Sequence, residues 1–596
     1  MADAEDFQRR VYPYRRSADQ DAATPVRHPV VVVGAGPVGL ALAIDLALQD
    51  VPVVLLDNDD RLSSGSRAIC FAKRTLEIFD RLGCGQRMVD KGVSWNVGRV
   101  FFRDEPVYRF DLLPEAGHGR PAFINLQQYY VEGYLADRAA ELPLIDLRWK
   151  HAVTGLEARS DHVLLTVDTP DGPYTLAADH VAACDGSRSP LRRMLGQESH
   201  GQVFRDRFLI ADVKMAADFP AERWFWFDPP FHRGQSVKDG EYTPSSVLLH
   251  KQPDGVWRID FQLGWDADPE AEKAPERILP RVQALLAHTA MKDAAFTLEW
   301  ASVYTFACLR MDAFRHGRVL FAGDSAHGVS PFGARGANSG VQDAENLAWK
   351  LAAVLQGRAG DALLASYGPE REYAADENIL NSTRATDFIT PKTPISRLFR
   401  DATLALARRH PFARTLVNSG RLSVPATLHA SALNTPDGAD ADWPGRAVPG
   451  AVAADAPVQA ADSTGLAPWL LRHTASGRFC ALLFDGPDNI ATLAALQAGA
   501  DGLAPLDVLL LRPTDVAATH PALPGCTTLV DSQGLAAQRH GAAPGSVVLL
   551  RPDQHVCARW RAGPASADAV RQALRRALAL DESAVAAKVA DASASA

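Results

Sequence analysis

Residues 29–57 read PVVVVGAGPVGLALAIDLALQDVPVVLLD, and this stretch decides the fold. Its β-branched run at 30–33 predicts a strand, residues 40–48 predict an apolar helix, and residues 51–56 predict a second strand. Neither strand alternates between apolar and polar residues, so both faces of the sheet should be buried. The stretch therefore predicts a β-α-β unit in a parallel sheet.

The turn between the first strand and the helix is GAGPVG at 34–39, the G-x-G-x-x-G pattern of a Rossmann-type unit. Its glycines permit the turn, close approach of the backbone to a pyrophosphate and close packing of the helix, whose N-terminus faces the phosphate charge. An acidic residue after the second strand is placed to accept hydrogen bonds from a ribose hydroxyl. The pattern predicts a dinucleotide site without deciding between FAD and NAD. The residues predicted to form it are Gly34, Gly36, Val38, Gly39 and Asp57.

A second block, GRVLFAGDSAHGVSPFGARGANSGVQDAENLAWKL, occupies residues 317–351. It predicts a short strand ending in Gly323 and Asp324, a glycine-rich loop, and a helix from about 340 to 355. Backbone N–H groups of the loop and the helix N-terminus can face an anionic ring edge, while the aspartate accepts bonds from sugar-like hydroxyls. A third block, CDGSRSPLR at 184–192, lies between the other two.

In their order along the chain, these three blocks resemble the FAD motifs of the class A flavoprotein aromatic hydroxylases, and the resemblance covers about residues 29–400. In that family the aspartate of the second block holds the ribityl chain, and the loop that follows covers the pyrimidine end of the flavin. The third block touches FAD and is implicated in the passage of NAD(P)H. The resemblance adds these cofactor-binding residues: Arg67, Gln128, Asp185, Gly323, Asp324, Gly336, Ala337 and Asn338.

The loop also departs from the family pattern. Ala334 stands where the family has its second glycine, and Arg335 stands where it has a glutamine, which puts the local loop shape in doubt. Pro331 matches the proline whose carbonyl lies near the substrate hydroxyl in the family.

Between about 200 and 310 the sequence predicts an antiparallel sheet, with strands at 208–215, 223–227, 246–251, 256–263 and 300–306. Arg258 and Asp260 lie two apart in one strand and share a face. By resemblance that face is turned toward flavin and substrate; the alternative is the solvent face. Together with Pro331 they are the predicted catalytic residues. The base that activates the substrate stays open, with His232 and His250 as candidates that are more often structural.

The predicted architecture is mixed α/β, in part α+β: a Rossmann-type FAD-binding domain is interleaved with an antiparallel-sheet substrate domain. The C-terminal domain resembles the thioredoxin-like tail of the phenol hydroxylase relatives, but it has no Cys-x-x-Cys motif. That last domain is expected to serve stability or homodimer contacts. The expected boundaries are an arm at 1–28, the FAD-binding domain at 29–200, the substrate domain at 201–310, the FAD-binding domain again with a helical region at 311–433, a linker at 434–463, and the C-terminal domain at 464–596.

Composition narrows the function classes. A formal net charge of -9 without a basic block argues against nucleic acid as a partner, and no apolar run is long enough for a membrane span. The acidic start argues against export, so a cytoplasmic protein is expected. The seven cysteines are scattered singly, which indicates neither a metal site nor disulfides.

The expected function is hydroxylation of a phenolic, small aromatic substrate with FAD, NADH or NADPH, and O2, through a flavin hydroperoxide as the resemblance implies. A flavin oxidase, reductase or halogenase on the same scaffold is one alternative, and a non-catalytic flavin-binding protein is another. The ring substituent and the choice between NADH and NADPH are not readable from the sequence.

Overall fold

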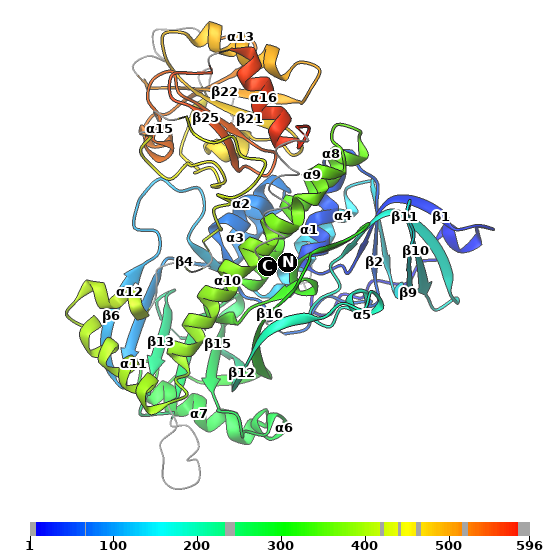
Figure 1. Cartoon of the computed structure of the whole chain (residues 1–596). Coiled ribbons are helices and arrows are strands. Elements are labelled where there is room, and N and C mark those ends of the chain that lie inside the picture. Colours follow the sequence, from blue (N-terminus) through cyan, green and yellow to red (C-terminus); the bar gives the residue numbers. More distant parts are fainter. Residues whose placement is uncertain are drawn as a thin grey trace.

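The computed structural model describes residues 7–65, 67–217, 219–232, 245–417, 422, 424–438, 443–460, 467–514, 523–564 and 566–581. Figure 1 shows three parts: a body built on a parallel sheet, a large antiparallel sheet below it, and a C-terminal domain above. The long helices α8 (Gly336–Leu355) and α10 (Tyr367–Ile389) run between these parts.

The body sheet confirms the predicted β-α-β unit. Its main path is β17-β18-β11-β1-β2-β8, and β1, β2, β8, β11 and β18 pair in parallel. The strands are β1 (Val26–Val33), β2 (Val53–Asp57), β8 (Ile145–Trp149), β9 (Ala152–Ala158), β10 (Val163–Asp168), β11 (Tyr174–Ala183), β17 (Arg315–His316) and β18 (Val319–Phe321). Helices α1 (Pro37–Ala47), α4 (Gln128–Ala140) and α8 share one hydrophobic core with this sheet.

The large antiparallel sheet has the order β19-β16-β12-β15-β14-β13-β5-β6, with only β13 and β5 parallel. Its strands are β5 (Val97–Phe102), β6 (Glu105–Asp111), β12 (Ser199–Met215), β13 (Arg223–Phe227), β14 (Ser246–Lys251), β15 (Val256–Gln262), β16 (Phe296–Met311) and β19 (His327–Gly328). One face packs on α7 (Pro275–Ala287), with α6 (Pro269–Glu272) beside it. The other face is turned toward the body.

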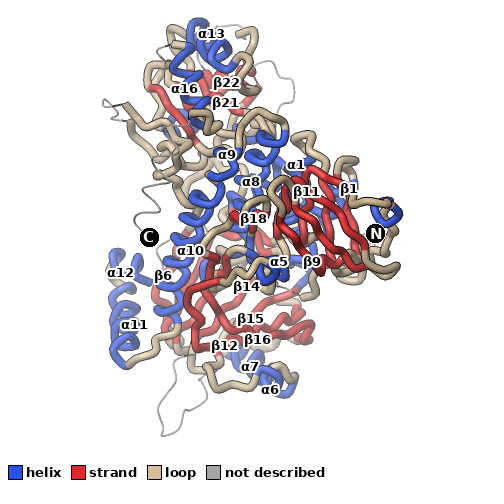
Figure 2. The backbone as a smooth tube through the Cα atoms, turned by 45° about the vertical axis from the view of Figure 1, so that its right-hand side comes forward, coloured by secondary structure: helices blue, strands red, loops and turns tan. Residues whose placement is uncertain are grey.

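A small sheet and several helices complete this part of the chain. In the turned view of Figure 2, the long helix α10 runs from the body down to the antiparallel sheet. The small sheet has the order β3-β7-β4. Its strands are β3 (Cys70–Ala72), β4 (Val93–Trp95) and β7 (Phe123–Asn125). The remaining helices of this part are α2 (Lys73–Arg81), α3 (Gly85–Lys91), α5 (Pro190–Met194), α9 (Asp361–Ala365), α11 (Pro394–Ala407) and α12 (Pro411–Val417).

The C-terminal domain is a six-stranded mixed sheet, β20-β23-β22-β21-β24-β25. Its strands are β20 (Gln459–Ala460), β21 (Phe479–Phe484), β22 (Leu506–Arg512), β23 (Thr527–Val530), β24 (Val547–Leu550) and β25 (Val556–Trp560). Helices α13 (Asn489–Ala500) and α16 (Ala567–Ala577) pack on one face, and α15 (Leu535–His540) packs on the other. The thioredoxin-like interpretation of this domain stays a prediction.

Two expected segments pack more tightly than the sequence suggested. In the N-terminal arm Phe7 is buried against Tyr130 and Tyr134 of α4. In the expected linker, Ala453, Ala456 and Val458 belong to the core of the C-terminal domain. Neither segment therefore behaves as a loose connection where it is described.

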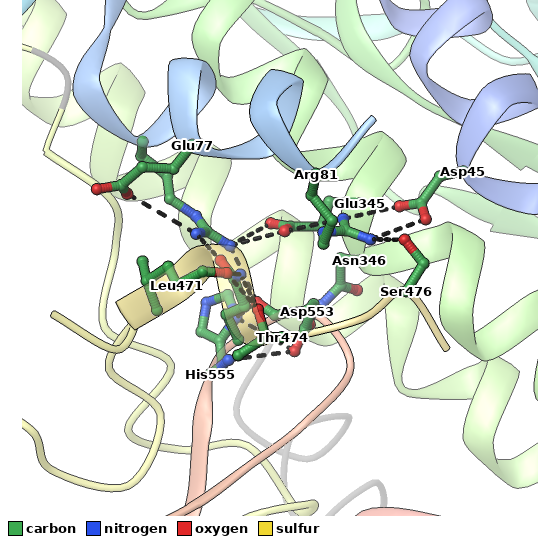
Figure 3. A network of polar contacts seen from close by, with 12 residues as sticks. Asp45, Glu77, Arg81, Glu345, Asn346, Leu471, Thr474, Ser476, Asp553 and His555 are labelled. Carbon is green, nitrogen blue, oxygen red and sulfur yellow. Dashed lines mark hydrogen bonds and ion pairs between the residues drawn. The ribbon is translucent and has the colours of Figure 1, made fainter. Parts of the chain in front are cut away.

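A turn of the C-terminal domain, residues 551–555 between β24 and β25, enters the body between α2, α8 and α10. Figure 3 shows the buried polar network that it joins. Arg551 binds Glu370 of α10 at 2.6 Å, and Asn346 of α8 donates to Asp553 at 3.1 Å. The same domain packs Leu510 and Leu574 into one core with Trp349 of α8.

Among the described residues, no helix is long and apolar enough to cross a membrane, and no group of three or more His, Cys, Asp or Glu side chains could hold a metal ion. All seven cysteines are free thiols.

Candidate active site

The glycine turn is shaped by the backbone around it. Gly34 has a φ of +105°, and a Cβ there or at Gly39 would collide with main-chain atoms of Cys184 or Gly34. A Cβ at Gly36 would meet no atom within 4 Å. Gly34 and Gly39 are therefore required by the fold, whereas Gly36 is the point where a ligand can approach the backbone closely.

Asp57 lies beside this turn at the end of β2. Its carboxylate accepts the N–H of Ala35 at 2.6 Å and the N–H of Asp59 at 2.8 Å. Burial raises the pKa of this carboxyl group, although the two N–H groups act in the opposite direction. Each oxygen keeps a further lone pair, so Asp57 can accept a ribose hydroxyl as predicted.

Val38 packs the two nucleotide motifs against each other. A Cβ on Gly323 would lie 2.9 Å from its side chain, and one on Gly340 would lie 2.7 Å from it. Small residues at these two positions let the N-terminal ends of α1 and α8 approach each other.

The second motif centres on Asp324, which is exposed to solvent directly after Gly323. The surrounding protein partly desolvates its carboxylate and raises its pKa; the neighbouring Asp343 adds to this, whereas His327 opposes it. Burial alone would raise the pKa of Asp343, but His327 at 2.6 Å and Arg371 at 2.6 Å lower it to about 2. Asp343 also accepts the N–H of Gly323 at 3.0 Å, and so fixes the motif from behind.

The first turn of α8 contains Gly336, Ala337 and Asn338, since the helix begins at Gly336. The prediction that these residues form a loop before a helix at 340 is therefore wrong. Asn338 accepts the N–H of Ala72 at 2.8 Å and donates to the carbonyl of Cys70 at 2.9 Å, so its side chain ties α8 to β3. The N–H groups of this first turn have no partner within the helix and can face an anionic ring edge.

The two departures from the family loop each have a structural consequence. Ala334 adopts a left-handed conformation with φ at +50°, the region that favours glycine. Arg335 is buried and donates to the side-chain oxygen of Asn378 in α10 at 3.0 Å. The alanine is accommodated with strain, and the arginine fixes the loop to the helix behind it.

The third motif contains an acceptor without a partner. One Asp185 oxygen accepts the N–H of Leu191 at 3.0 Å, whereas its Oδ1 is buried and has no hydrogen-bond partner among the described residues. Burial raises the pKa of this carboxyl group. Arg192 donates to the carbonyl of Ser325 at 2.7 Å and joins this motif to the second one.

Gln128 and Arg67 make contacts around the start of β3. The side chain of Gln128 accepts the N–H of Ala68 at 3.0 Å and donates to Glu132 at 2.7 Å. Arg67 is exposed, and its carbonyl accepts a hydrogen bond from Arg258 of β15 at 2.9 Å. This bond connects the body directly to the large antiparallel sheet.

Arg258 and Asp260 lie on the body-facing side of that sheet and not on its solvent face. Arg258 is buried, and its Nε lies 2.8 Å from Asp260 Oδ1. Across the sheet, Arg258 is level with Asp212 of β12 and His250 of β14. Buried polar side chains therefore cover the body-facing side of the sheet at this level.

Pro331 is exposed in the loop between Asp324 and α8. The next residue, Phe332, packs between Phe208 and Phe306 of the antiparallel sheet, with ring centroids 5.0 Å apart in both pairs. One loop thus reaches the second nucleotide motif at one end and an aromatic cluster at the other.

The donors and acceptors of these motifs fit FAD: open space at Gly36, an unpartnered oxygen on Asp185, an accessible Asp324 and the first-turn N–H groups of α8. A sequence model of a family described as FAD binding domain matches residues 27–382. The chain belongs to this FAD-binding family. Its cofactor is FAD, and the resemblance to flavoprotein aromatic hydroxylases is confirmed.

Two relatives illustrate the range of this family. One relative is a 3-(3-hydroxy-phenyl)propionate/3-hydroxycinnamic acid hydroxylase of Mycobacterium sp. (strain JLS). The two chains are 31% identical over 364 residues, a match that covers 61% of this chain and 60% of the relative. This chain is 31% identical over 381 residues to a 12-dehydrotetracycline 5-monooxygenase/anhydrotetracycline 6-monooxygenase of Streptomyces rimosus, which covers 62% of this chain and 71% of that protein. The match thus spans 60% of the length of the first relative.

Two solved structures share the fold over nearly the whole chain. The flavin-dependent monooxygenase PieE, in complex with FAD and substrate, superimposes with a TM-score of 0.76 at 22% identity and covers 93% of this chain and 100% of its own. Aklavinone-11 hydroxylase with FAD and aklavinone gives 0.68 at 22% identity, with the same coverage. These similarities confirm the mixed α/β architecture.

Proposed function

We propose that this FAD-binding protein is a monooxygenase that hydroxylates a phenolic or other electron-rich aromatic ring, with NADH or NADPH as reductant and O2 as the oxygen source. When bound, FAD would supply the redox chemistry of hydride acceptance and oxygen transfer, with the second oxygen atom of O2 released as water. The observation that carries the proposal is the loop from Asp324 to α8. It joins the flavin motif to the aromatic cluster around Phe332, so a ring held beside Pro331 would lie next to the cofactor.

The residues of the chain would position the ring and exclude water. Phe208, Phe306 and Phe332 form a buried aromatic cluster that supports the loop carrying Pro331. The Pro331 carbonyl would accept the hydrogen bond of a ring hydroxyl, which makes the ring more electron-rich. Arg258, held by Asp260 and by the carbonyl of Arg67, would keep the antiparallel sheet against the FAD-binding segment.

The relatives support the proposed hydroxylation, because the names of both describe hydroxylation or monooxygenation of ring compounds. A cytoplasmic homodimer is part of the same proposal. Asp185 and Arg192 stand near the path that NAD(P)H would use, as the resemblance of their motif suggests.

Turnover assays test the proposal directly. Purified protein should be yellow, and a suitable phenol should accelerate NAD(P)H oxidation and yield a product one oxygen atom heavier. A panel of hydroxybenzoates, hydroxyphenylpropionates, alkylphenols and polycyclic phenols, analysed by mass spectrometry, identifies the ring. NAD(P)H consumption that is indifferent to every member of the panel would contradict the proposal.

A further inference from the structure

A row of buried polar side chains crosses the body-facing side of the antiparallel sheet. The strand registers place Asp212 level with Arg258, and Arg258 level with His250. Trp224 is level with Leu249, so Arg223 follows His250 in the same row. These side chains are 3–7% exposed: Arg223 7%, Asp212 4%, His250 3% and Arg258 5%.

Two of the four members of this row are bound to other protein groups. Arg258 pairs with Asp260, and Asp212 accepts a hydrogen bond from Gln252 at 3.2 Å. Arg223 differs, because its guanidinium has neither a hydrogen bond nor an ion pair among the described residues. His250 also keeps an unpartnered Nδ1, and its Nε2 lies 3.9 Å from Asp260.

The Arg223 guanidinium has no acceptor among the described residues but keeps a little access to solvent, so its N–H donors can meet a ligand. Burial lowers the pKa of Arg223, and the Arg258 charge acts in the same direction. Burial and the two arginines likewise hold the pKa of His250 well below its ordinary value, so the imidazole is neutral. Arg223 thus offers several N–H donors, and the neutral imidazole of His250 beside it can donate or accept a hydrogen bond.

The location of Arg223 connects it to the flavin motifs. Sγ of Cys70 in β3 donates to the side-chain oxygen of Asn125 at 3.2 Å, and Asn125 donates to the carbonyl of Lys251, the residue after His250, at 2.8 Å. These two bonds place β3 beside the strand that carries His250. Two residues after Cys70, the N–H of Ala72 is held by Asn338 in the first turn of α8. Arg223 therefore lies between the antiparallel sheet and the strand that leads to the flavin-facing end of α8.

We infer that Arg223, with His250 beside it, binds an anionic oxygen of the aromatic substrate, either a carboxylate on the ring's side chain or an ionised phenol. The inference rests on the proposed function and names the substrate class more narrowly. The planar guanidinium offers two parallel N–H donors, which is the geometry that such oxygens accept best. A substrate oxygen would supply the acceptor that the protein itself withholds.

Arg223→Gln tests the inference, with Arg99→Gln as the matched control. Arg99 lies on the adjacent strand β5 level with Trp224, hence on the opposite face, and pairs with Glu222 at the surface. Two ligand pairs are titrated against the absorption of bound, oxidised FAD. The first pair is 3-(3-hydroxyphenyl)propionate and uncharged 3-propylphenol; the second is ionised 4-nitrophenol and nitrobenzene.

The wild-type protein and Arg99→Gln should bind the charged member of at least one pair about tenfold more tightly, and Arg223→Gln should bind both members alike. Discrimination in the first pair identifies a carboxylate, and discrimination in the second identifies an ionised phenol. Equal affinities in the wild type, or a preference that survives in Arg223→Gln, would overturn the inference. No turnover is needed, so a failure of the proposed hydroxylation would appear separately, in the NAD(P)H assay.

Thermal stability gives a second readout. Without ligand, Arg223→Gln should keep its FAD and melt at the same or a higher temperature, because the substitution removes a buried charge without a protein partner. A clear fall in the melting temperature of the FAD-bound protein would show that Arg223 is held by the protein itself, and would contradict a role in ligand binding.

Discussion

Nη2 of Arg74 in α2 lies 2.7 Å from both carboxylate oxygens of Glu345 in α8, and both side chains are buried. The same Arg74 nitrogen donates to the carbonyl of Asp553 at 3.0 Å, so this ion pair lies where the C-terminal domain meets the body. Arg81 adds a second guanidinium, 3.1 Å from Glu345 (Figure 3). One carboxylate therefore serves two buried cations.

Glu345→Gln should destabilise the protein strongly. The substitution keeps the shape of the side chain but removes the charge, which leaves two buried guanidiniums undercompensated; breaking such a pair costs about 3–5 kcal/mol. Calorimetry or chemical denaturation should show this loss, and the exposed Glu276→Gln should not. A Glu345→Gln protein as stable as the wild type would mean that the network contributes little to the folded state.

Asp455→Asn should change how stability depends on pH. Burial, together with Glu77, raises the pKa of Asp455 to about 6. Because the pKa of this carboxyl group in the folded protein lies above its ordinary value of 3.8, its contribution to stability is complete below about pH 4 and is lost as the pH rises through about 6. The amide can still accept the N–H of Leu471, now 3.0 Å from the carboxylate, so the variant should gain up to about 3 kcal/mol at neutral pH.

Melting temperatures measured from pH 4 to 8 test this point. The wild type should lose stability between about pH 4 and 6 relative to Asp455→Asn, while the exposed Asp293→Asn should follow the wild type. If the melting temperatures of the wild type and Asp455→Asn change with pH in the same way, ionisation of Asp455 does not cause the loss of stability above pH 4.

The sequence predicted those elements whose signal is local. Strands β13 and β14 occupy the predicted residues 223–227 and 246–251, because aromatic and branched residues there are bounded by turn-forming segments. The start of α8 was missed, since Gly336 and Asn338 are poor helix formers. That turn is stabilised by the bonds of Asn338 to Ala72 and Cys70, which no local pattern encodes.

The candidate site shows the same division. The positions of the glycine turn and of Asp324 follow from motif and spacing, because the local backbone holds each of them in place. The roles of Arg223, Arg371 and Asp343 depend on which distant strands and helices cover them. For Asp343, the sequence offered one signal, a charged residue inside the mostly apolar stretch of α8. Arg223, next to Trp224, offered no comparable signal.

Ala334→Gly should stabilise the loop that reaches the substrate side. An L-residue in the left-handed region costs about 1–2 kcal/mol, and the extra freedom of glycine in the unfolded chain returns about 0.4–1 kcal/mol of this. A net gain of up to about 1 kcal/mol is expected from thermal unfolding. Ala494→Gly, at an exposed position inside α13, should instead lose about 1 kcal/mol. Equal losses in both variants would show that the φ of +50° at Ala334 carries no strain.

Asp324→Ala should weaken FAD binding without unfolding the protein. The side chain is exposed and makes no hydrogen bond or ion pair with the described residues, so its loss should remove contacts to the cofactor and little else. One lost charge-assisted hydrogen bond is worth about 1.5–3 kcal/mol, which raises the Kd for FAD by roughly 10- to 150-fold. The ratio of flavin to protein absorbance after dialysis, and titration of the apoprotein with FAD, measure this change. Asp312→Ala, at a highly exposed carboxylate after β16, is the control that should retain FAD. An Asp324→Ala protein with undiminished FAD content would place the ribityl contact on another residue.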